Sequence, residues 1–175
     1  DPLLSLAEAG LCEPAWSARV MDEARLAIME VRHVPDVRAR GFLDAICRAF
    51  PMAMAEDWER FEPDVNLSDP NDGHVVAAAR RAGAETIVTF NLKDFPEEEL
   101  GRWELLALHP DDYLTELAER LIRKNFLPDP LLRVLKRQRC ALRKPPLGVE
   151  DFLEILRRAG LATFTEALGP YKGHL

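Results

Sequence analysis

The sequence predicts an α/β fold, in which a parallel sheet is flanked by helices and followed by a C-terminal helical extension. Two segments, 85–90 and 103–108, are short and apolar, which is typical of strands buried on both faces of a parallel sheet. Periodic apolar residues before and after these segments indicate helices. From Pro128 onward the chain is predicted to be wholly helical.

Helices precede the first strand. One is predicted over residues 1–10, and Ser17 is a suitable N-cap for a second that runs to about Val31. A third is predicted over residues 36–50, and residues 52–55 favour a short strand. The third helix is expected to point its apolar residues inward, namely Val37, Phe42, Leu43, Ile46 and Phe50.

A helix rich in alanine leads into the first strand. Asp69, Asn71 and Asp72 precede it, so polar groups stand where the first unpaired helical N–H groups need partners. Gly83 ends this helix, the strand 85–90 follows, and Asn91 to Asp94 then lie at its C-terminal end. In open parallel sheets this edge is where ligands bind.

We expect a single domain with two parts. An α/β part spans residues 1–127, and a helical extension over residues 128–175 packs on it, because no Gly/Ser linker separates the two. Beyond the strand 103–108, the segment 110–112 is predicted to start a helix at Tyr113 that runs to about Ile122, and further helices are predicted at 130–141, 149–158 and 161–168.

The composition is that of a globular chain. Its 175 residues, 47% of them hydrophobic, are enough to bury a core. No run approaches the roughly 18 apolar residues that a membrane span requires, and no export signal is evident, so a cytoplasmic location without a membrane partner is expected. Cys12, Cys47 and Cys140 are widely spaced, which favours buried reduced thiols.

The formal net charge of -7 is not typical of a dedicated nucleic-acid binder, but the charge is unevenly distributed. One short segment is strongly basic. It is either a patch for RNA or an acidic partner, or a solvated helix face. Its residues are Arg133, Lys136, Arg137, Arg139, Arg143 and Lys144.

Two carboxylates, Asp72 and Asp94, are predicted to converge at the sheet edge. Carboxylates held together are costly unless a cation neutralises them or one stays protonated, so a metal site is one interpretation. The alternative is that Asp72 only caps a helix and Asp94 only shapes a turn. Glu23, between apolar turns of its helix, either points toward the sheet edge or faces solvent.

With these residues in view, the chain resembles the PIN-domain family, and more closely its bacterial members of the VapC-like toxin type. The resemblance covers residues 3 to about 117, and the tail also resembles that of a subset of the family. The matching segments are Trp16-Ser17 followed by Glu23, Phe50-Pro51, Asp69-Pro70-Asn71-Asp72-Gly73-His74, Thr86-Ile87-Val88-Thr89-Phe90-Asn91-Leu92-Lys93-Asp94 and Pro110-Asp111-Asp112-Tyr113-Leu114.

This resemblance implies a Mg²⁺- or Mn²⁺-dependent endoribonuclease. Glu23, Asp72 and Asp94 resemble the metal-binding and catalytic carboxylates of the family, and Asn91 stands at a further catalytic position where many members have an aspartate. Because Asn lacks charge, weaker metal affinity or the loss of one ion is expected. The first strand of the family, with its aspartate, is expected before Asp1 and is absent from the sequence.

The implied reaction is phosphodiester hydrolysis by a metal-activated water. The resemblance further implies an RNA substrate, an antitoxin whose tail covers the acidic crevice, and a homodimer. The alternative function is a catalytically degenerate PIN-like domain that binds RNA or a protein without cutting it. An enzyme with a nucleotide cofactor is not favoured, because the chain lacks Gly-x-Gly-x-x-Gly and Gly-x-x-x-x-Gly-Lys-Ser/Thr.

Overall fold

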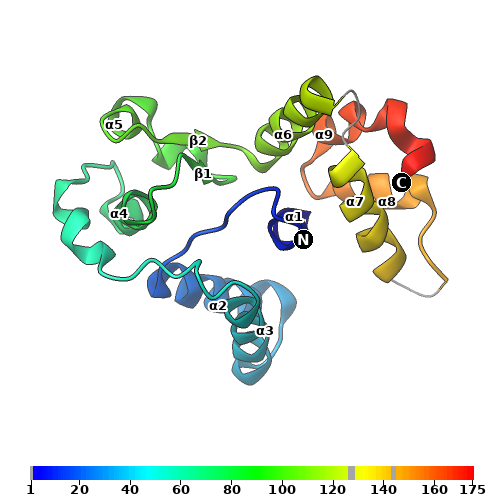
Figure 1. Cartoon of the computed structure of the whole chain (residues 1–175). Coiled ribbons are helices and arrows are strands. Elements are labelled where there is room, and N and C mark those ends of the chain that lie inside the picture. Colours follow the sequence, from blue (N-terminus) through cyan, green and yellow to red (C-terminus); the bar gives the residue numbers. More distant parts are fainter. Residues whose placement is uncertain (1, 126–128, 143–144) are drawn as a thin grey trace. The chain divides into compact units, whose positions relative to one another are not determined.

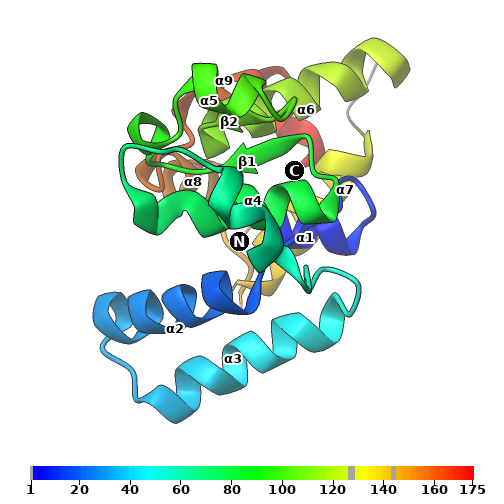
Figure 2. The same ribbon diagram turned by 90° about the vertical axis from the view of Figure 1, so that its left-hand side faces the viewer.

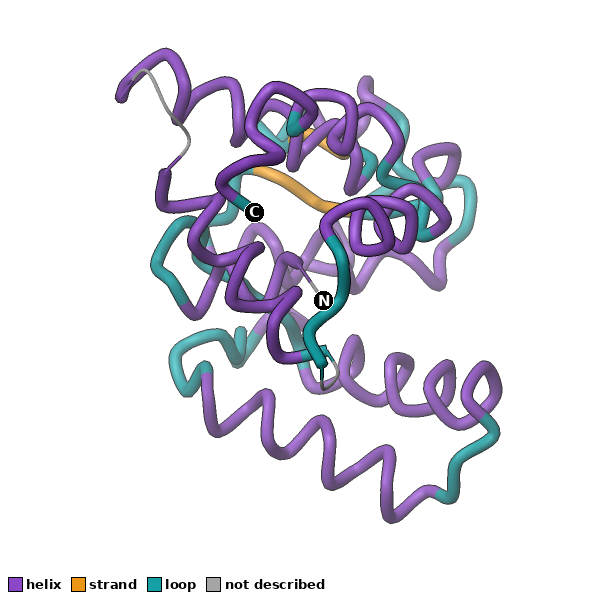
Figure 3. Tube along the Cα trace, turned by 90° about the vertical axis from the view of Figure 1, so that its right-hand side faces the viewer, coloured by secondary structure: helices purple, strands orange, loops and turns teal. Residues whose placement is uncertain are grey.

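The computed structural model describes residues 2–125, 129–142 and 145–175. Helices make up most of it, and the strands are short (Figures 1 and 3). The chain forms two compact units. We call residues 14–107 the middle unit, and residues 1–13 together with 108–175 the end unit.

The helices lie close to where the sequence predicts them. The end unit contains α1 (Pro2–Glu8), α6 (Pro110–Asn125), α7 (Asp129–Ala141), α8 (Val149–Arg158), α9 (Ala162–Ala167) and the 3₁₀ segment η4 (Gly169–His174). The middle unit contains α2 (Ala18–Arg32), α3 (Asp36–Ala49), η1 (Trp58–Asp64), η2 (Pro70–Asp72), α4 (Gly73–Ala82), η3 (Leu92–Asp94) and α5 (Glu97–Gly101).

Helix α2 begins as predicted. The Ser17 hydroxyl accepts a hydrogen bond from the Val20 backbone N–H at 3.2 Å, which satisfies one of the free donors at the helix start. Helices α2 and α3 lie side by side (Figure 2).

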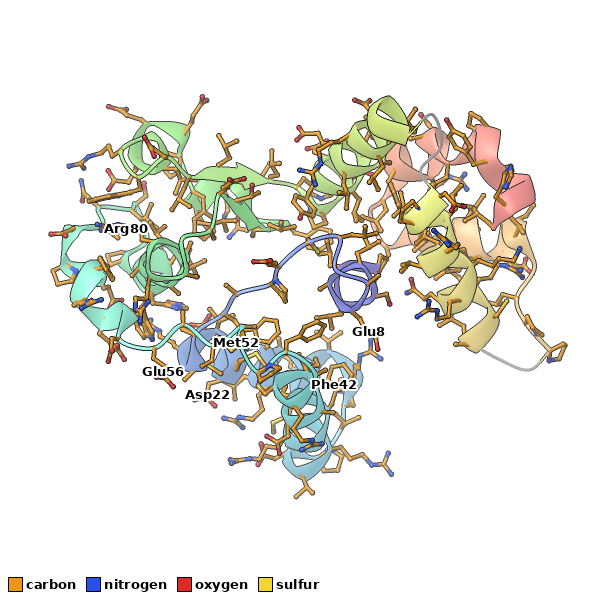
Figure 4. All side chains as sticks on the ribbon, viewed as in Figure 1. Glu8, Asp22, Phe42, Met52, Glu56 and Arg80 are labelled. Carbon is orange, nitrogen blue, oxygen red and sulfur yellow. The ribbon has the colours of Figure 1, made fainter. Side chains whose placement is uncertain are left out.

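The predicted burial of the α3 apolar face is wrong in part. Leu43 is buried, but Val37 is 80% exposed and Phe42, labelled in Figure 4, is 54% exposed. Every residue of α2 lies in the described part of the chain, and none of them is buried. Periodicity identifies the apolar side of a helix, whereas burial also requires another element to cover that side.

Strands β1 (Thr86–Val88) and β2 (Leu106–Leu108) form a two-stranded parallel sheet within the described residues. The α/β class is therefore confirmed, but the expectation of strands buried on both faces is wrong. Ile87 is buried in β1, whereas Leu106 in β2 is 55% exposed. Helix α4 packs against β1, so burial follows the side that a helix covers.

Segment 52–55 pairs at one point: Met54 forms an isolated parallel bridge with Trp16. Trp58 begins a 3₁₀ helix and is buried beside the alanines of α4. Arg80 of α4, labelled in Figure 4, stacks with its Cζ 3.3 Å from the centre of the Trp103 ring and 4.9 Å from that of Phe61. These cation–π contacts hold α4 to the segments before and after it.

The end unit has its own apolar core. Leu6 of α1 is fully buried there, together with residues from α6 to α9 such as Leu117, Leu131 and Phe164. Helix α1 lies in the part of the chain that resembles the PIN-domain family, yet it packs with the C-terminal helices. The predicted boundary between residues 127 and 128 lies outside the described residues, and the predicted domain division stays a prediction.

The three cysteines are free. Cys12 and Cys47 are half-buried, but Cys140 is exposed, so its predicted burial is wrong. His109 is structural, as its Nδ1 accepts a hydrogen bond from the Asp111 backbone N–H at 3.1 Å. Within the described ranges, no helix is both long enough and apolar enough to cross a bilayer.

Candidate functional site

The turn before α4 separates the roles of two aspartates. The Asp69 carboxylate accepts a hydrogen bond from the Asn71 backbone N–H at 2.9 Å and so caps η2. Asp72 directly precedes α4, but among the described residues its side chain makes no capping hydrogen bond. Asp72 is therefore not a side-chain cap of α4, which was the alternative to a role at a metal site.

Asp72 is half-buried in a field of negative charge. Burial raises the pKa of Asp72, and the carboxylates of Asp69, Asp94 and Glu23 raise it further, whereas His74 opposes the shift. A raised pKa of this origin means that the ionised form is short of compensating positive charge. We call Glu23, Asp72, Asp94 and Asn91 the acidic site.

Asp94 and Asn91 lie together in the turn after β1. The Asn91 side-chain amide donates a hydrogen bond to Oδ2 of Asp94, and the Asn91 backbone N–H donates to the Thr89 hydroxyl at 3.0 Å. The Asp94 backbone N–H in turn lies 3.4 Å from the Asn91 carbonyl. The turn thus fixes Asn91 and orients one oxygen of Asp94.

Glu23 extends from α2, and its side chain is 52% exposed. Its Oε1 lies 3.0 Å from Nε2 of His74 and 3.5 Å from Nε of Arg19. Arg19 also lies 3.3 Å from Oε1 of Glu62 and donates to the Asn71 carbonyl at 3.2 Å. One guanidinium therefore connects α2 with η1 and with the turn that carries Asp72.

His74 is fully buried near the start of α4. Its ring meets that of Trp58 at 5.9 Å between centroids, with 62° between the ring planes. Burial lowers the pKa of His74, while the Glu23 carboxylate acts in the opposite direction. The neutral imidazole is thus favoured by burial and the charged form by Glu23.

The electrostatics connects three of the residues that the sequence singles out, since Asp94 and Glu23 both act on Asp72. Nevertheless, the part of the chain that the structure describes contains no group of three His, Cys, Asp or Glu residues arranged to hold a metal ion. Carboxylate oxygens are the donors that Mg²⁺ and Mn²⁺ take, so the donor chemistry fits such an ion. The metal-binding roles of Glu23, Asp72 and Asp94 and the catalytic role of Asn91 stay predictions.

Sequence reasoning missed Arg19 and His74 as partners of Glu23. The spacing of Arg19 and Glu23 by one helical turn is a signal that could have identified the first pair. Nothing in the sequence pattern connects His74 with Glu23, because their contact depends on how α2 and α4 meet.

The basic segment is partly engaged in structure. Arg133 pairs with Asp129 at 2.9 Å, and Arg139 donates to the backbone carbonyls of Leu147 and Leu175. Lys136 and Arg137 are exposed on α7, and residues 143–144 lie outside the described residues. The patch for RNA or an acidic partner therefore stays a prediction, with a solvated helix face as its alternative.

Comparison with known proteins adds two family matches. Residues 1–93 match the model described as "PIN domain", and residues 110–170 match the model described as "VapC50 C-terminal domain". A protein of Mycobacterium tuberculosis (strain ATCC 25618 / H37Rv), named "Putative ribonuclease VapC50", is 56% identical over 45 residues. That match covers 26% of this chain and 27% of the relative, so the chain spans about a quarter of the relative's length. No solved structure matches.

Proposed function

The chain belongs to the PIN-domain family, and from this premise we propose that it is a divalent-metal-dependent endoribonuclease, the toxin of a toxin–antitoxin pair. The observation that carries the proposal is the crowding of negative charge at Asp72, to which Asp94 and Glu23 contribute. Such crowding costs free energy, and a divalent cation relieves it. The name of the partial relative, which describes a ribonuclease, also supports this activity.

Glu23, Asp72 and Asp94 are the residues proposed to hold Mg²⁺ or Mn²⁺. Such an ion supplies an activated water and neutralises charge on the scissile phosphate of RNA. Asp72 offers a carboxylate that is not engaged in capping. Asn91 keeps Asp94 oriented through its side-chain amide, a role that an aspartate at this position could not perform as a donor.

The test compares matched Asp-to-Asn variants of the full chain. We expect Asp72→Asn and Asp94→Asn each to lower metal-dependent cleavage of single-stranded RNA by about 100-fold or more, since each removes a charged oxygen ligand. Asp44→Asn is the control, because Asp44 is an exposed residue of α3 outside the acidic site. A chelator should abolish cleavage, and added Mn²⁺ or Mg²⁺ should restore it.

Unchanged cleavage in both Asp72→Asn and Asp94→Asn would remove these residues from the mechanism. Circular dichroism of each variant establishes that a loss of cleavage is not a loss of folding. Equal loss in Asp44→Asn would show that the assay reports stability rather than chemistry.

A binding module without catalysis is the second candidate. The uncharged Asn91, and the lack of a three-residue metal cluster in the described part of the chain, favour it. Calorimetric titration with Mn²⁺ separates the two functions. A chain that binds RNA but no Mn²⁺ at millimolar concentration would be a binding module.

The partners follow from the family and are proposals as well. We propose that an antitoxin segment covers the acidic site and that the chain forms a homodimer in the cytoplasm. Co-purification of the chain with the product of an adjacent gene, with light scattering to give the mass, tests both partners. A monomer that co-purifies with no such product would contradict them.

A further inference from the structure

We propose that His74 is a positioning residue that, together with Arg19, holds the Glu23 carboxylate in the acidic site. The inference rests on the proposed function, because it assigns Glu23 to the metal-binding residues. It extends that function to two side chains for which the resemblance predicts no role.

The first support is the geometry at Glu23. His74 and Arg19 both approach Oε1, at 3.0 and 3.5 Å. Both of these contacts in the described part of the chain are made through Oε1, which leaves Oε2 for a ligand. A half-exposed Glu on a helix would otherwise sample several rotamers, and ordering it costs conformational entropy. A fixed partner at Oε1 reduces that cost before a cation binds.

The second support is the packing of the imidazole itself. It is fully buried, and the Trp58 ring packs against it edge to face. A neutral imidazole that approaches a carboxylate through Nε2 carries its proton there, which leaves Nδ1 as an acceptor. In the described part of the chain Nδ1 is buried without a hydrogen-bond partner.

An unpaired buried nitrogen costs free energy that an apolar side chain would avoid. Packing alone therefore does not account for a histidine at this position. The contact with Glu23 explains why a polar ring is present here. Nε2 and Oε1 lie close together, but they are not aligned as in a standard hydrogen bond.

The third support is the reach of Arg19. Its guanidinium contacts Glu23 and Glu62, and donates to the carbonyl of Asn71, the residue just before Asp72. Movement of Glu23 away from this turn would break its contact with Arg19. Glu23 is thus contacted by a partly exposed side chain, Arg19, and by a fully buried one, His74.

The test is a double-mutant cycle on Mn²⁺ affinity, measured by calorimetry with the full chain. Replacing a partner of a metal ligand typically weakens binding by about 10–100-fold, and we expect this loss in His74→Phe, which keeps a ring against Trp58. His74→Gln keeps an N–H donor and should retain more of the affinity. In an E23Q background, His74→Phe should cause no further loss, because its effect passes through Glu23.

Equal loss caused by His74→Phe in both backgrounds would show a purely structural role and overturn the proposal, as would unchanged affinity. If His74→Phe fails to fold, Arg19→Met tests the same coupling from the surface side. It should also weaken Mn²⁺ binding in the native background, and the loss should be smaller in E23Q, where only the Arg19 contacts with Glu62 and the Asn71 carbonyl remain to be lost.

A measurement without metal separates this inference from the proposed function. Imidazole ¹⁵N resonances of the unmodified chain should show the Nε2–H tautomer, and E23Q should shift them. Unshifted His74 resonances would overturn the positioning role even in an active nuclease. Conversely, shifted resonances in a chain that binds no Mn²⁺ would refute the nuclease and leave the His74–Glu23 pair standing.

Discussion

Asp111 is a buried carboxylate that caps a helix other than its own. It lies in the first turn of α6, and its two oxygens accept hydrogen bonds from the backbone N–H groups of Phe164 at 2.7 Å and Thr163 at 2.9 Å. The residue before α9, Leu161, provides no side-chain cap. One charge therefore joins the start of α6 to the start of α9 within the end unit.

Removing this charge should weaken the end unit. Burial alone would raise the pKa of Asp111, but the N–H groups of Phe164 and Thr163 outweigh it and lower the pKa. We expect Asp111→Ala to lower the free energy of unfolding by about 3 kcal/mol, because two buried N–H groups lose a charged acceptor. Urea denaturation measures this loss, with the exposed neighbour as control: Asp112→Ala should change stability by less than about 0.5 kcal/mol.

The same substitution predicts a pH dependence. A carboxylate whose pKa is depressed in the folded state contributes stability above its unfolded pKa of roughly 3.9, and loses it as the pH falls through the folded value. The difference in unfolding free energy between the native chain and Asp111→Ala should therefore be constant near neutrality and shrink below about pH 4. A difference that grew on acidification would contradict the assigned cause.

At this scale the sequence identifies residue types better than partners. It indicates polar caps before α4, but not that Asp69 caps while Asp72 does not. It indicates that the segment 110–112 starts a helix, but not that the Asp111 carboxylate accepts a hydrogen bond from a residue 53 positions further on. Such choices depend on side-chain geometry within a turn or on tertiary contacts, which local spacing does not contain.

At the scale of elements, α3 separates apolar character from burial. Leu43 is 8% exposed and Val37 is 80% exposed on the same helix. We expect Leu43→Ala to cost about 2–4 kcal/mol, since it leaves a cavity, and Val37→Ala to change stability by less than about 0.5 kcal/mol. Thermal unfolding of the two variants provides the comparison, and similar losses would mean that Val37 is covered in solution.

Gly83 ends α4 in the left-handed region, with φ at +65°. Space is not the constraint, because a Cβ there would meet no atom within 4 Å. We expect Gly83→Ala to destabilise the chain by about 1 kcal/mol through backbone strain. Gly41→Ala, in the interior of α3 and equally unobstructed, should instead stabilise it by about 0.5–1 kcal/mol. Chemical denaturation of both variants checks this opposite sign.

Helix positions could be predicted from the sequence because caps and stops are local. Ser17 and Gly83 begin and end their helices as expected. The burial of strands and helix faces could not, because it depends on which layers cover them. Ile87 is buried and Leu106 is exposed although both come from apolar segments.

At the scale of the molecule, the chain begins in the end unit, forms the middle unit and then returns. Helix α1 lies within the match to the PIN-domain model, yet it packs with helices matched by the C-terminal-domain model. The α/β class and the helical tail could be predicted from motifs and periodicity. The membership of α1 in the end unit could not, because its partners are distant in sequence.

This topology predicts which helices are destabilised by a substitution in α1. Leu6→Ala should destabilise the end unit by about 2–5 kcal/mol, because it opens a cavity in an apolar core. Hydrogen exchange should show lost protection in α6 to α9 and retained protection in α4. Leu26→Ala, at a residue 55% exposed in α2, is the control. Equal loss in α4 after Leu6→Ala would contradict the division into two units.

The early position of α1 also affects synthesis of the polypeptide. Helix α1 leaves the ribosome before the middle unit, whereas the other buried residues of its core are translated only after Leu108. With roughly 100 intervening residues added at about 5–20 per second, this leucine waits roughly 5–20 s in water. During that delay the nascent chain exposes an apolar segment of the kind that chaperones bind.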